Sequence, residues 1–316
     1  MPTLKVSEPP RPTALERLVD DYLVACRARG LSSKTVKFVY AYVLKQVFLP
    51  FCKREGAEAP AQVDRRLLDR FSTELLETGG RRGKLSKHSV HSYVRCTNSF
   101  LAWARQEGEV APGTRAQLPK LGRRLLEVLT RDEVRAMEDV AKTERDKLIV
   151  RVLADSGIRV GELVGLRTTD LVVQGGRRQF LRVRGKGDLE RLVPISPRLH
   201  ARLRRYADRG RPKDVATDRL FIALRRSSGG ELEPLTTSGV QQMIKILGQE
   251  AGVQKRVYPH LLRHSFVTWS LTKGMNPVQL AQIVGHSSLS MIQQVYSHLT
   301  PSDAYDAMLK VLTAED

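Results

Sequence analysis

The sequence predicts a mainly α-helical protein of two domains, with a small antiparallel β-sheet in the second domain. Apolar residues recur at helical spacing along most of the 316 residues, whereas strand-like runs are confined to residues 171–195. A segment rich in proline, glycine and basic residues, 113–126, separates two such regions and is typical of a linker. We therefore expect a helical domain over residues 12–112 and a mixed domain over residues 127–316.

Each helix of the first domain is expected from an apolar stripe with a start or a stop signal. Gly30 follows the first stripe and predicts its end, and serines at 32 and 33 precede the second. Pro50 is expected to break or end that second helix, because proline has no backbone N–H to donate. The expected apolar stripes are residues 15–23, 36–47, 63–76 and 86–106.

The second domain begins with a helix signal and then changes its period. Thr130 and Glu133 have the spacing of a capping box, which predicts a helix start. A largely buried helix is expected at 146–155. Three short β-type runs follow at 171–173, 180–184 and 191–195, and a glycine-rich turn predicts that the last two form a hairpin. Further helices are expected at 241–249, 261–272, 277–284 and 303–312.

The composition indicates a folded, strongly basic protein. Hydrophobic residues make up 41% and charged residues 28%, and Lys plus Arg number 53 against 34 for Asp plus Glu, a formal net charge of +19. Such an excess favours a polyanionic partner, nucleic acid before an anionic membrane, although a solvated basic surface is the alternative. No apolar run is long enough to span a bilayer.

The cysteines and the first residues bear on the compartment. Cys26, Cys52 and Cys96 are odd in number and widely spaced, which is typical of buried packing residues in a reducing cytoplasm. The first residues lack the apolar stretch of a secretory signal. We therefore expect a cytoplasmic protein.

Residues able to carry chemistry gather in the last third of the chain. His260 and Arg263 are three apart, so they share one helix face and can each hold an anionic oxygen. His286 follows Gly285, and Tyr296 comes ten residues later. Taken singly, each has a commoner structural explanation: a cap, a surface cation or a tyrosine at the core edge.

Together these residues resemble the pattern of tyrosine recombinases of the phage integrase and Xer type. The segment Ser156-Gly157-Ile158-Arg159-Val160-Gly161-Glu162-Leu163 resembles the first arginine box of that family, and Lys186 in the Gly-Lys-Gly turn resembles its hairpin lysine. The His260-x-x-Arg263 motif, Gly285-His286 and Tyr296 complete the pattern in the family's order. Trp269 departs from it, since a polar residue is expected there.

The resemblance implies a site-specific DNA recombinase. Its fold would be a C-shaped clamp, formed by a helical core-binding domain and an α+β catalytic domain. Tyr296 would attack a phosphodiester to give a covalent 3′-phosphotyrosyl intermediate, as in integration, excision or dimer resolution. A phenol suits this role because it leaves more readily than a deoxyribose alkoxide, so the bond energy is kept.

The remaining groups have roles that fit phosphoryl transfer. The implied catalytic residues are Arg159, Lys186, His260, Arg263, His286 and Tyr296, with Glu162 in support. A guanidinium fork matches two phosphate oxygens, a lysine can protonate the leaving oxygen, and the histidines donate hydrogen bonds or carry protons. Which histidine does which stays open. Glu162 either orients a catalytic group or forms a helix-surface ion pair.

No metal or nucleotide cofactor is expected, because the sequence shows neither a carboxylate cluster for two metals nor a phosphate-binding GxxxxGK[ST] loop. The expected partners are double-stranded DNA at specific sites and further copies of the chain in a tetramer, with a second recombinase or an accessory protein as an open possibility. Residues 304–312 are candidates for a helix exchanged between neighbours, or for a terminal helix packed on its own domain. The alternative functions are a type IB topoisomerase-like enzyme and a catalytically inactive DNA-binding protein.

Overall fold

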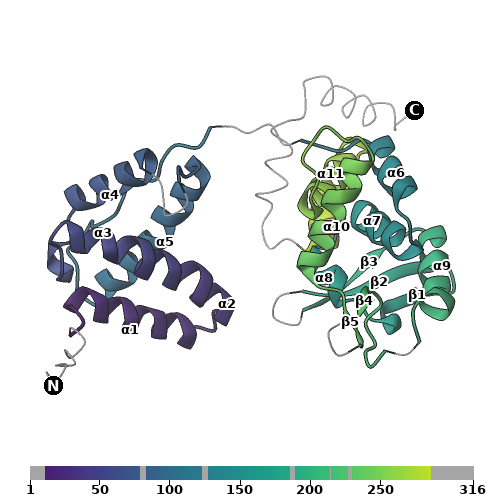
Figure 1. The fold of residues 1–316 in the computed structure, drawn as a ribbon, viewed down its shortest axis with the longest axis horizontal. Helices are drawn as coiled ribbons and strands as arrows, with labels where there is room; N and C mark the ends of the chain where they lie inside the picture. The colour runs from purple at the N-terminus through teal and green to yellow at the C-terminus, as the bar shows by residue number, and fades with distance from the viewer. Residues whose placement is uncertain are drawn as a thin grey trace, which may run out of the picture. The chain divides into compact units, whose positions relative to one another are not determined.

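The structure of the protein is a computed structural model that describes residues 11–78, 83–122, 127–185, 189–213, 215–226 and 230–285. The chain divides into two compact units, and the division lies between Arg123 and Arg124 (Figure 1). This point falls inside the segment 113–126 that the sequence predicts as a linker. The helix expected at 303–312 lies outside the described residues.

All the regular elements named in the described part of the first unit are helices, as the sequence predicts. Its core contains edge-to-face aromatic pairs, among them Phe48 against Phe71 at a centroid distance of 5.2 Å. The three cysteines are buried and unpaired, which confirms their role in packing. The elements are α1 (Ala14–Ala28), α2 (Ser33–Thr35), η1 (Val36–Ala41), η2 (Leu44–Phe48), α3 (Leu49–Arg54), η3 (Pro60–Gln62), α4 (Arg65–Glu77) and α5 (Lys87–Gln106).

The prediction that Pro50 breaks or ends the second helix is wrong. The chain stays helical from Ser33 to Arg54, and Pro50 lies near the start of α3. The segment η2 that precedes it is a π-helical turn, in which hydrogen bonds span five residues instead of four. We attribute the continuity to this wider turn, which accommodates a residue that offers no N–H and crowds the preceding carbonyls.

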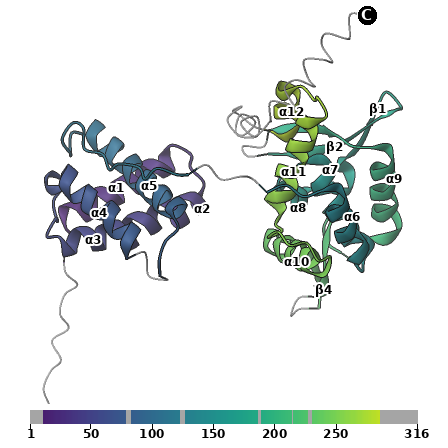
Figure 2. The same ribbon diagram turned by 90° about the horizontal axis from the view of Figure 1, so that it is seen from above.

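The second unit is built around α7 (Glu144–Ser156), which is buried along most of its length. It packs against α6, α8, α9 and α11, and the two views in Figures 1 and 2 place it inside the unit. The capping box expected at Thr130 is present and starts α6. The other helices are α6 (Arg131–Val140), α8 (Val160–Gly165), η4 (Thr168–Asp170), α9 (Pro197–Arg205), η5 (Tyr206–Gly210), α10 (Thr237–Glu250), α11 (Pro259–Thr272) and α12 (Pro277–Val284).

The expected sheet is present as a three-stranded antiparallel sheet in the order β1-β2-β3. Its strands are β1 (Leu171–Gln174), β2 (Arg178–Arg184) and β3 (Glu190–Pro194). The ladder between β2 and β3 runs from Phe180 opposite Pro194 to Arg184 opposite Glu190, so the predicted hairpin pairing is confirmed. A mainly α fold with small antiparallel sheets is therefore observed.

A second sheet was not predicted. The strands β4 (Ile222–Arg226) and β5 (Leu232–Pro234) form a two-stranded antiparallel pair, although the sequence confines strand-like runs to residues 171–195. Both strands are short, and the register shifts between their two paired ends. Such a pair leaves no sustained alternation in the sequence, which explains why the period gave no signal.

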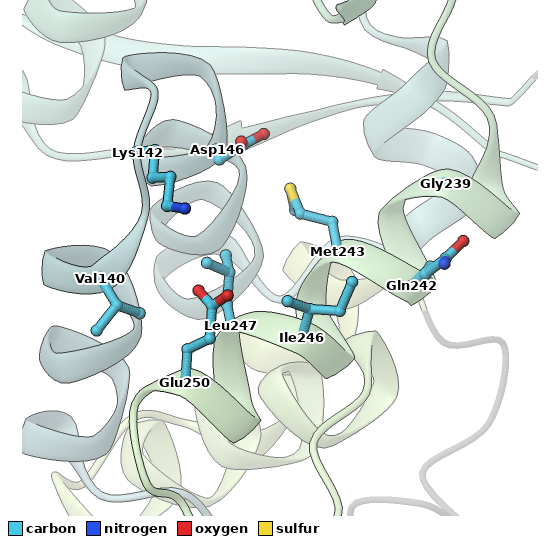
Figure 3. A pocket seen from close by; sticks show the side chains of 9 residues that line it. All are labelled: Val140, Lys142, Asp146, Gly239, Gln242, Met243, Ile246, Leu247 and Glu250. Carbon is cyan, nitrogen blue, oxygen red and sulfur yellow. The ribbon is translucent and has the colours of Figure 1, made fainter. Parts of the chain in front are cut away.

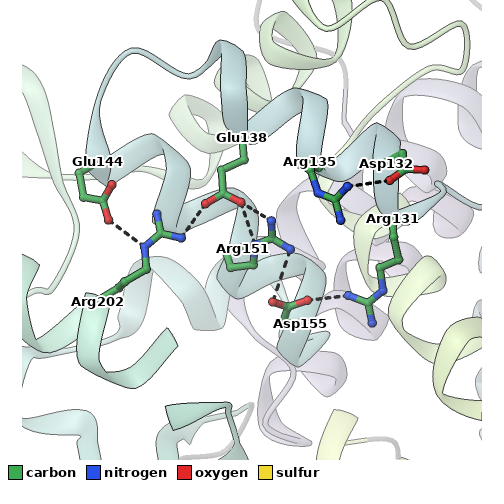
Figure 4. Close-up of polar contacts among 8 residues, drawn as sticks. All are labelled: Arg131, Asp132, Arg135, Glu138, Glu144, Arg151, Asp155 and Arg202. Carbon is green, nitrogen blue, oxygen red and sulfur yellow. Dashed lines mark hydrogen bonds and ion pairs between the residues drawn. The ribbon is translucent and has the colours of Figure 1, made fainter. Parts of the chain in front are cut away.

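A network of arginines and carboxylates joins α6, α7 and α9 on the second unit (Figure 4). Glu138 of α6 accepts hydrogen bonds from Arg151 and from Arg202, the latter at 2.6 Å. The network continues from Arg202 to Glu144 and from Arg151 to Asp155. Of the carboxylates in these pairs, Glu138 is the most buried, with 13% of its side chain exposed. It therefore contributes more than an exposed surface pair would.

Replacing Glu138 with glutamine is expected to destabilise the second unit by about 1.5–3 kcal/mol, the range for hydrogen bonds to charged groups. Burial alone raises the pKa of Glu138, but the hydrogen bonds from Arg202 and Arg151 outweigh it and hold the pKa below its ordinary value of 4.5. The stabilisation is thus complete above the unfolded pKa and lost as pH falls through the folded one. Urea unfolding of both proteins against pH measures this.

The matched control is Glu144→Gln, because Glu144 is half exposed at the outer end of the same network. Its replacement is expected to cost less than about 1 kcal/mol. An equal loss in both variants, or a difference between wild type and Glu138→Gln that persists at acid pH, would contradict this assignment.

No helix within the described ranges is long and apolar enough to cross a membrane.

Candidate active site

Three arginines from different elements converge on the carboxyl end of α12. Arg159 directly precedes α8, Arg191 lies in β3, and Arg263 lies on α11, which packs beside α12. The last carbonyls of a helix carry partial negative charge and lack intrahelical partners, so cations bind well there. The hydrogen bonds run from Arg191 Nε to the carbonyl of Ile283 (2.8 Å), from Arg263 Nη2 to Val284 (2.7 Å) and from Arg159 Nη2 to Gly285 (2.9 Å).

Arg263 is almost fully buried, with 1% of its surface exposed. Besides Val284, it donates to the carbonyl of Gly157, the residue that ends α7. Gly157 has a φ of +61°, and a Cβ there would lie 2.4 Å from the ring of Phe266, so this close approach requires glycine. Burial and the charge of Arg159 lower the pKa of Arg263 to about 10, which still leaves it charged at neutral pH.

Glu162 is the carboxylate at the centre of this cluster. It caps α8 by accepting from the backbone N–H of Arg159 at 2.8 Å, and it accepts from Arg159 Nη1 at 3.0 Å. Arg191 binds both carboxylate oxygens, at 3.0 and 2.8 Å. Burial raises the pKa of Glu162, yet these bonds hold it below its ordinary value. Only 8% of Glu162 is exposed, which excludes the surface ion pair.

The cluster has more positive than negative charge. Arg159 and Arg191 pair with the one carboxylate of Glu162, and Arg263 interacts with it electrostatically, so the described members of the cluster carry two positive charges in excess. The carbonyl oxygens at the end of α12 offset part of this repulsion. A surplus of fixed cationic donors at one place is what binding of an anion such as a phosphodiester requires.

His260 lies in the first turn of α11, one turn before Arg263. Partial removal from water, together with the charges of Arg263 and Arg159, lowers its pKa below the ordinary 6.5. His260 is therefore neutral at pH 7 and able to accept a proton. The ring of His264 lies 6.3 Å from that of His260, and burial, together with the positive charge of Arg263, lowers the pKa of His264.

Three predicted residues, Lys186, His286 and Tyr296, lie outside the described residues. The residues that directly precede Lys186 and His286 are described, and both lie at the arginine cluster. Gly185 directly precedes Lys186 in the hairpin, and a Cβ on it would lie 3.9 Å from Glu162 Oε1. Gly285, which ends α12, accepts the hydrogen bond of Arg159. The structure thus brings together Arg159, Glu162, His260 and Arg263.

Arg191 was not among the residues predicted from the sequence. In the sequence it is one of many arginines in a basic protein, and its strand position suggests only an ordinary side chain of the sheet. The available signal was its place in the hairpin strand that follows Lys186. That signal gains meaning only when the fold places β3 beside α12.

Metal ligands and cavities are the other features that can mark a site. No group of three or more His, Cys, Asp or Glu side chains that could hold a metal occurs within the described ranges. A hollow of about 350 Å³ lies between α6, α7 and α10, and Figure 3 shows Met243, Ile246 and Leu247 beside it. None of its lining residues belongs to the arginine cluster, and its lining is mainly apolar.

Comparisons with known proteins agree on one family. The family model described as "Phage integrase family" matches residues 127–303. Tyrosine recombinase XerD of Listeria monocytogenes serotype 4b is 30% identical over 295 residues, covering 90% of this chain and 94% of the relative. Tyrosine recombinase XerA of Pyrococcus horikoshii is 29% identical over 299 residues, covering 94% of each chain.

A solved structure extends the likeness to the fold. The Tn1549 transposon integrase, in complex with a circular intermediate DNA, superposes with a TM-score of 0.71 and 20% sequence identity. The match covers 95% of this chain and 100% of the integrase chain. At this identity the likeness concerns the fold alone.

Proposed function

Because the chain belongs to the phage integrase family and is a tyrosine-type site-specific DNA recombinase, we propose that it cleaves and rejoins DNA with Tyr296 as its nucleophile. The observation that carries the proposal is the convergence of Arg159 and Arg263 on one point, beside the segment that leads to His286. Two buried or half-buried guanidinium forks with surplus charge are suited to the non-bridging oxygens of a phosphodiester.

The proposed reaction is a transesterification without net loss of a phosphodiester. The hydroxyl oxygen of Tyr296 attacks phosphorus, and the bond from phosphorus to the 5′ oxygen breaks. The tyrosine proton passes to His260, whose lowered pKa keeps it unprotonated beforehand. Lys186 protonates the departing 5′ oxygen. A 5′-hydroxyl then attacks the 3′-phosphotyrosine, and the same steps run in reverse.

Arg159, Arg263 and His286 serve the phosphate in this scheme. The transition state accumulates negative charge on the equatorial oxygens, and fixed donors stabilise it without having to reorganise. Glu162 supports Arg159 through the hydrogen bonds described above. No metal or nucleotide takes part in these steps.

The domain roles and the assembly belong to the same proposal. Residues 12–112 would form the core-binding domain, 113–126 the linker and 127–316 the catalytic domain, closing on double-stranded DNA as a C-shaped clamp. Exchange between two duplexes requires four cleavages, so four copies of the chain would act on two specific sites, with or without a second recombinase or accessory protein. A cytoplasmic location remains a prediction.

The proposal is tested with a nicked suicide substrate, from which the cleaved fragment diffuses away and leaves the covalent intermediate trapped. A protein–DNA adduct that survives denaturing electrophoresis is expected. On paired sites, recombinant products are expected, whereas relaxation of supercoiled DNA without recombinants would favour a topoisomerase-like activity. Absence of any adduct on every candidate site would overturn the proposal.

DNA affinity is expected to fall steeply with salt, because the net charge of +19 implies many phosphate contacts. For roughly six to ten contacts, the association constant falls by about 10³–10⁵ between about 50 and 200 mM salt. Fluorescence anisotropy with a labelled duplex over a salt series measures the slope. A flat response would show that the positive charge faces something other than DNA.

A further inference from the structure

Arg191 connects three elements at the arginine cluster and has no role in the reaction proposed above. Its side chain is 16% exposed, and its guanidinium makes contacts on two edges. One edge forms a two-point pair with Glu162, at 3.0 and 2.8 Å, and Nε donates to the carbonyl of Ile283 at 2.8 Å. A single side chain therefore links β3, α8 and the last turn of α12.

Arg191 also packs directly on Gly285. A Cβ at Gly285 would lie 2.9 Å from the guanidinium carbon, and the residue has a φ of +67°. Any larger residue would collide with Arg191 and would be strained in this conformation. The end of α12 is thus fixed by a hydrogen bond at Ile283 and by contact at Gly285.

Glu162 connects Arg191 to Arg159. Its Oε1 accepts from Arg159 Nη1 and from Arg191 Nη1, both at 3.0 Å. Arg191 donates to both carboxylate oxygens of Glu162. The side chain of Arg159 therefore donates to Glu162 through Nη1 alone, and its Nη2 is directed to the carbonyl of Gly285. Without Arg191, Glu162 would be able to take both donors of Arg159 in a two-point pair, which is the favoured geometry for these groups.

We propose that Arg191, anchored at the end of α12, is a positioning residue for DNA cleavage: it holds Glu162 so that Arg159 faces the scissile phosphate. This inference rests on the proposed function. In this proposal Arg191 has no contact with the phosphate, because its described hydrogen bonds are directed to Glu162 and Ile283. Its contribution passes through Arg159, and a misplacement of about 1 Å at a reacting group costs on the order of 10²-fold in rate.

The test is a double-mutant cycle on the single-turnover rate of adduct formation with the nicked substrate. Arg191→Gln is expected to slow the wild-type chain by roughly 10- to 100-fold, with DNA affinity within about twofold, since Arg191 makes no phosphate contact. In an Arg159→Ala background the same change is expected to cost less than about threefold, because the residue it acts through is gone.

Two further variants keep the test decisive. Arg182→Gln on the neighbouring strand is the matched control, since Arg182 is 40% exposed and pairs only loosely with Glu190, at 3.9 Å; it is expected to match wild type. If Arg191→Gln fails to fold in thermal unfolding, Arg191→Lys replaces it. Lysine keeps the charge but not the fork, and is expected to fold and to cleave slowly.

The outcomes separate the two claims. If wild type forms the adduct while Arg191→Gln or Arg191→Lys cleaves at the wild-type rate, the inference falls and the proposed function stands. Equal losses in the wild-type and Arg159→Ala backgrounds would show a contribution independent of Arg159 and would also overturn it. If wild type forms no adduct at all, the proposed function itself fails, and this inference fails with it.

Discussion

Replacing Tyr296 with phenylalanine is expected to abolish the covalent protein–DNA adduct completely. The substitution removes only the hydroxyl oxygen that would form the bond to phosphorus, and no other atom of the ring can take its place. DNA affinity is expected to stay within about twofold of wild type, since phosphate contacts supply most of the binding. Suicide-substrate cleavage followed by denaturing electrophoresis measures the first, and anisotropy measures the second.

Tyr258→Phe is the matched control. Tyr258 directly precedes α11 and is the described tyrosine nearest to His260 in the sequence. It is 40% exposed, so removing its hydroxyl is not expected to disturb the fold. The control is expected to form the adduct at the wild-type rate. Loss of the adduct in Tyr258→Phe, with its retention in Tyr296→Phe, would mean that the nucleophile has been assigned to the wrong tyrosine.

Replacing Arg263 with lysine is expected to lower the rate of adduct formation by about 10²–10³-fold, the cost of removing one fixed donor from an oxyanion site. Lysine keeps a positive charge but presents no planar fork, so it cannot bind two oxygens in the same way. It also cannot reach both carbonyls that Arg263 binds, at Gly157 and Val284. At a position with 1% exposure, an unsatisfied carbonyl costs about 1–3 kcal/mol.

Stability and rate must therefore be measured together for this variant. The rate is compared at a temperature well below the unfolding midpoint of Arg263→Lys, so that the folded fraction is the same as in wild type. The matched control is Arg135→Lys, because Arg135 is 68% exposed and its ion pair within the described part of the chain is with its helix neighbour Asp132. A folded Arg263→Lys chain that cleaves at the wild-type rate would remove Arg263 from the proposed mechanism.

Local signals predicted the helices and the first sheet well, because they depend on neighbours in the sequence. The capping box at Thr130 and the helix end at Gly285 are short-range patterns with fixed backbone consequences. The same reasoning failed at Pro50, where a π-helical turn absorbs the missing donor, and at β4 and β5, whose pairing is too short to leave a period.

The site was predicted in part, for a different reason. The resemblance supplied Arg159, Glu162, His260 and Arg263, and the structure brings these four together. Nothing local in the sequence distinguishes Arg191 from other arginines, since its importance arises from the packing of β3 against α12. The burial of Glu162 is likewise a property of the folded unit.

Trp269 illustrates a departure that only the structure explains. The sequence pattern favours a polar residue there, yet the guanidinium of Arg131 lies 3.9 Å from the centre of the indole ring. Arg131 also pairs with Asp155 at 2.7 Å, so the tryptophan supports one end of the ion-pair network in Figure 4. A cation over an aromatic face stabilises by about 0.5–2 kcal/mol. Trp269 thus contributes to packing beside Arg131.

The carbonyl groups at the end of α12 accept hydrogen bonds from the same arginines that are proposed to bind the DNA phosphate. If Arg159 and Arg263 bind a phosphate as proposed, the phosphate oxygens compete with the carbonyls of Gly285 and Val284 for the same N–H donors. Thermodynamic reciprocity then requires that DNA binding loosen these two carbonyls to the same extent that the carbonyls weaken DNA binding. Arg191, which holds Ile283 and no phosphate, stands outside this competition. DNA binding would thus weaken two of the three arginine hydrogen bonds at the end of α12, while the hydrogen bond from Arg191 to Ile283 stays in place.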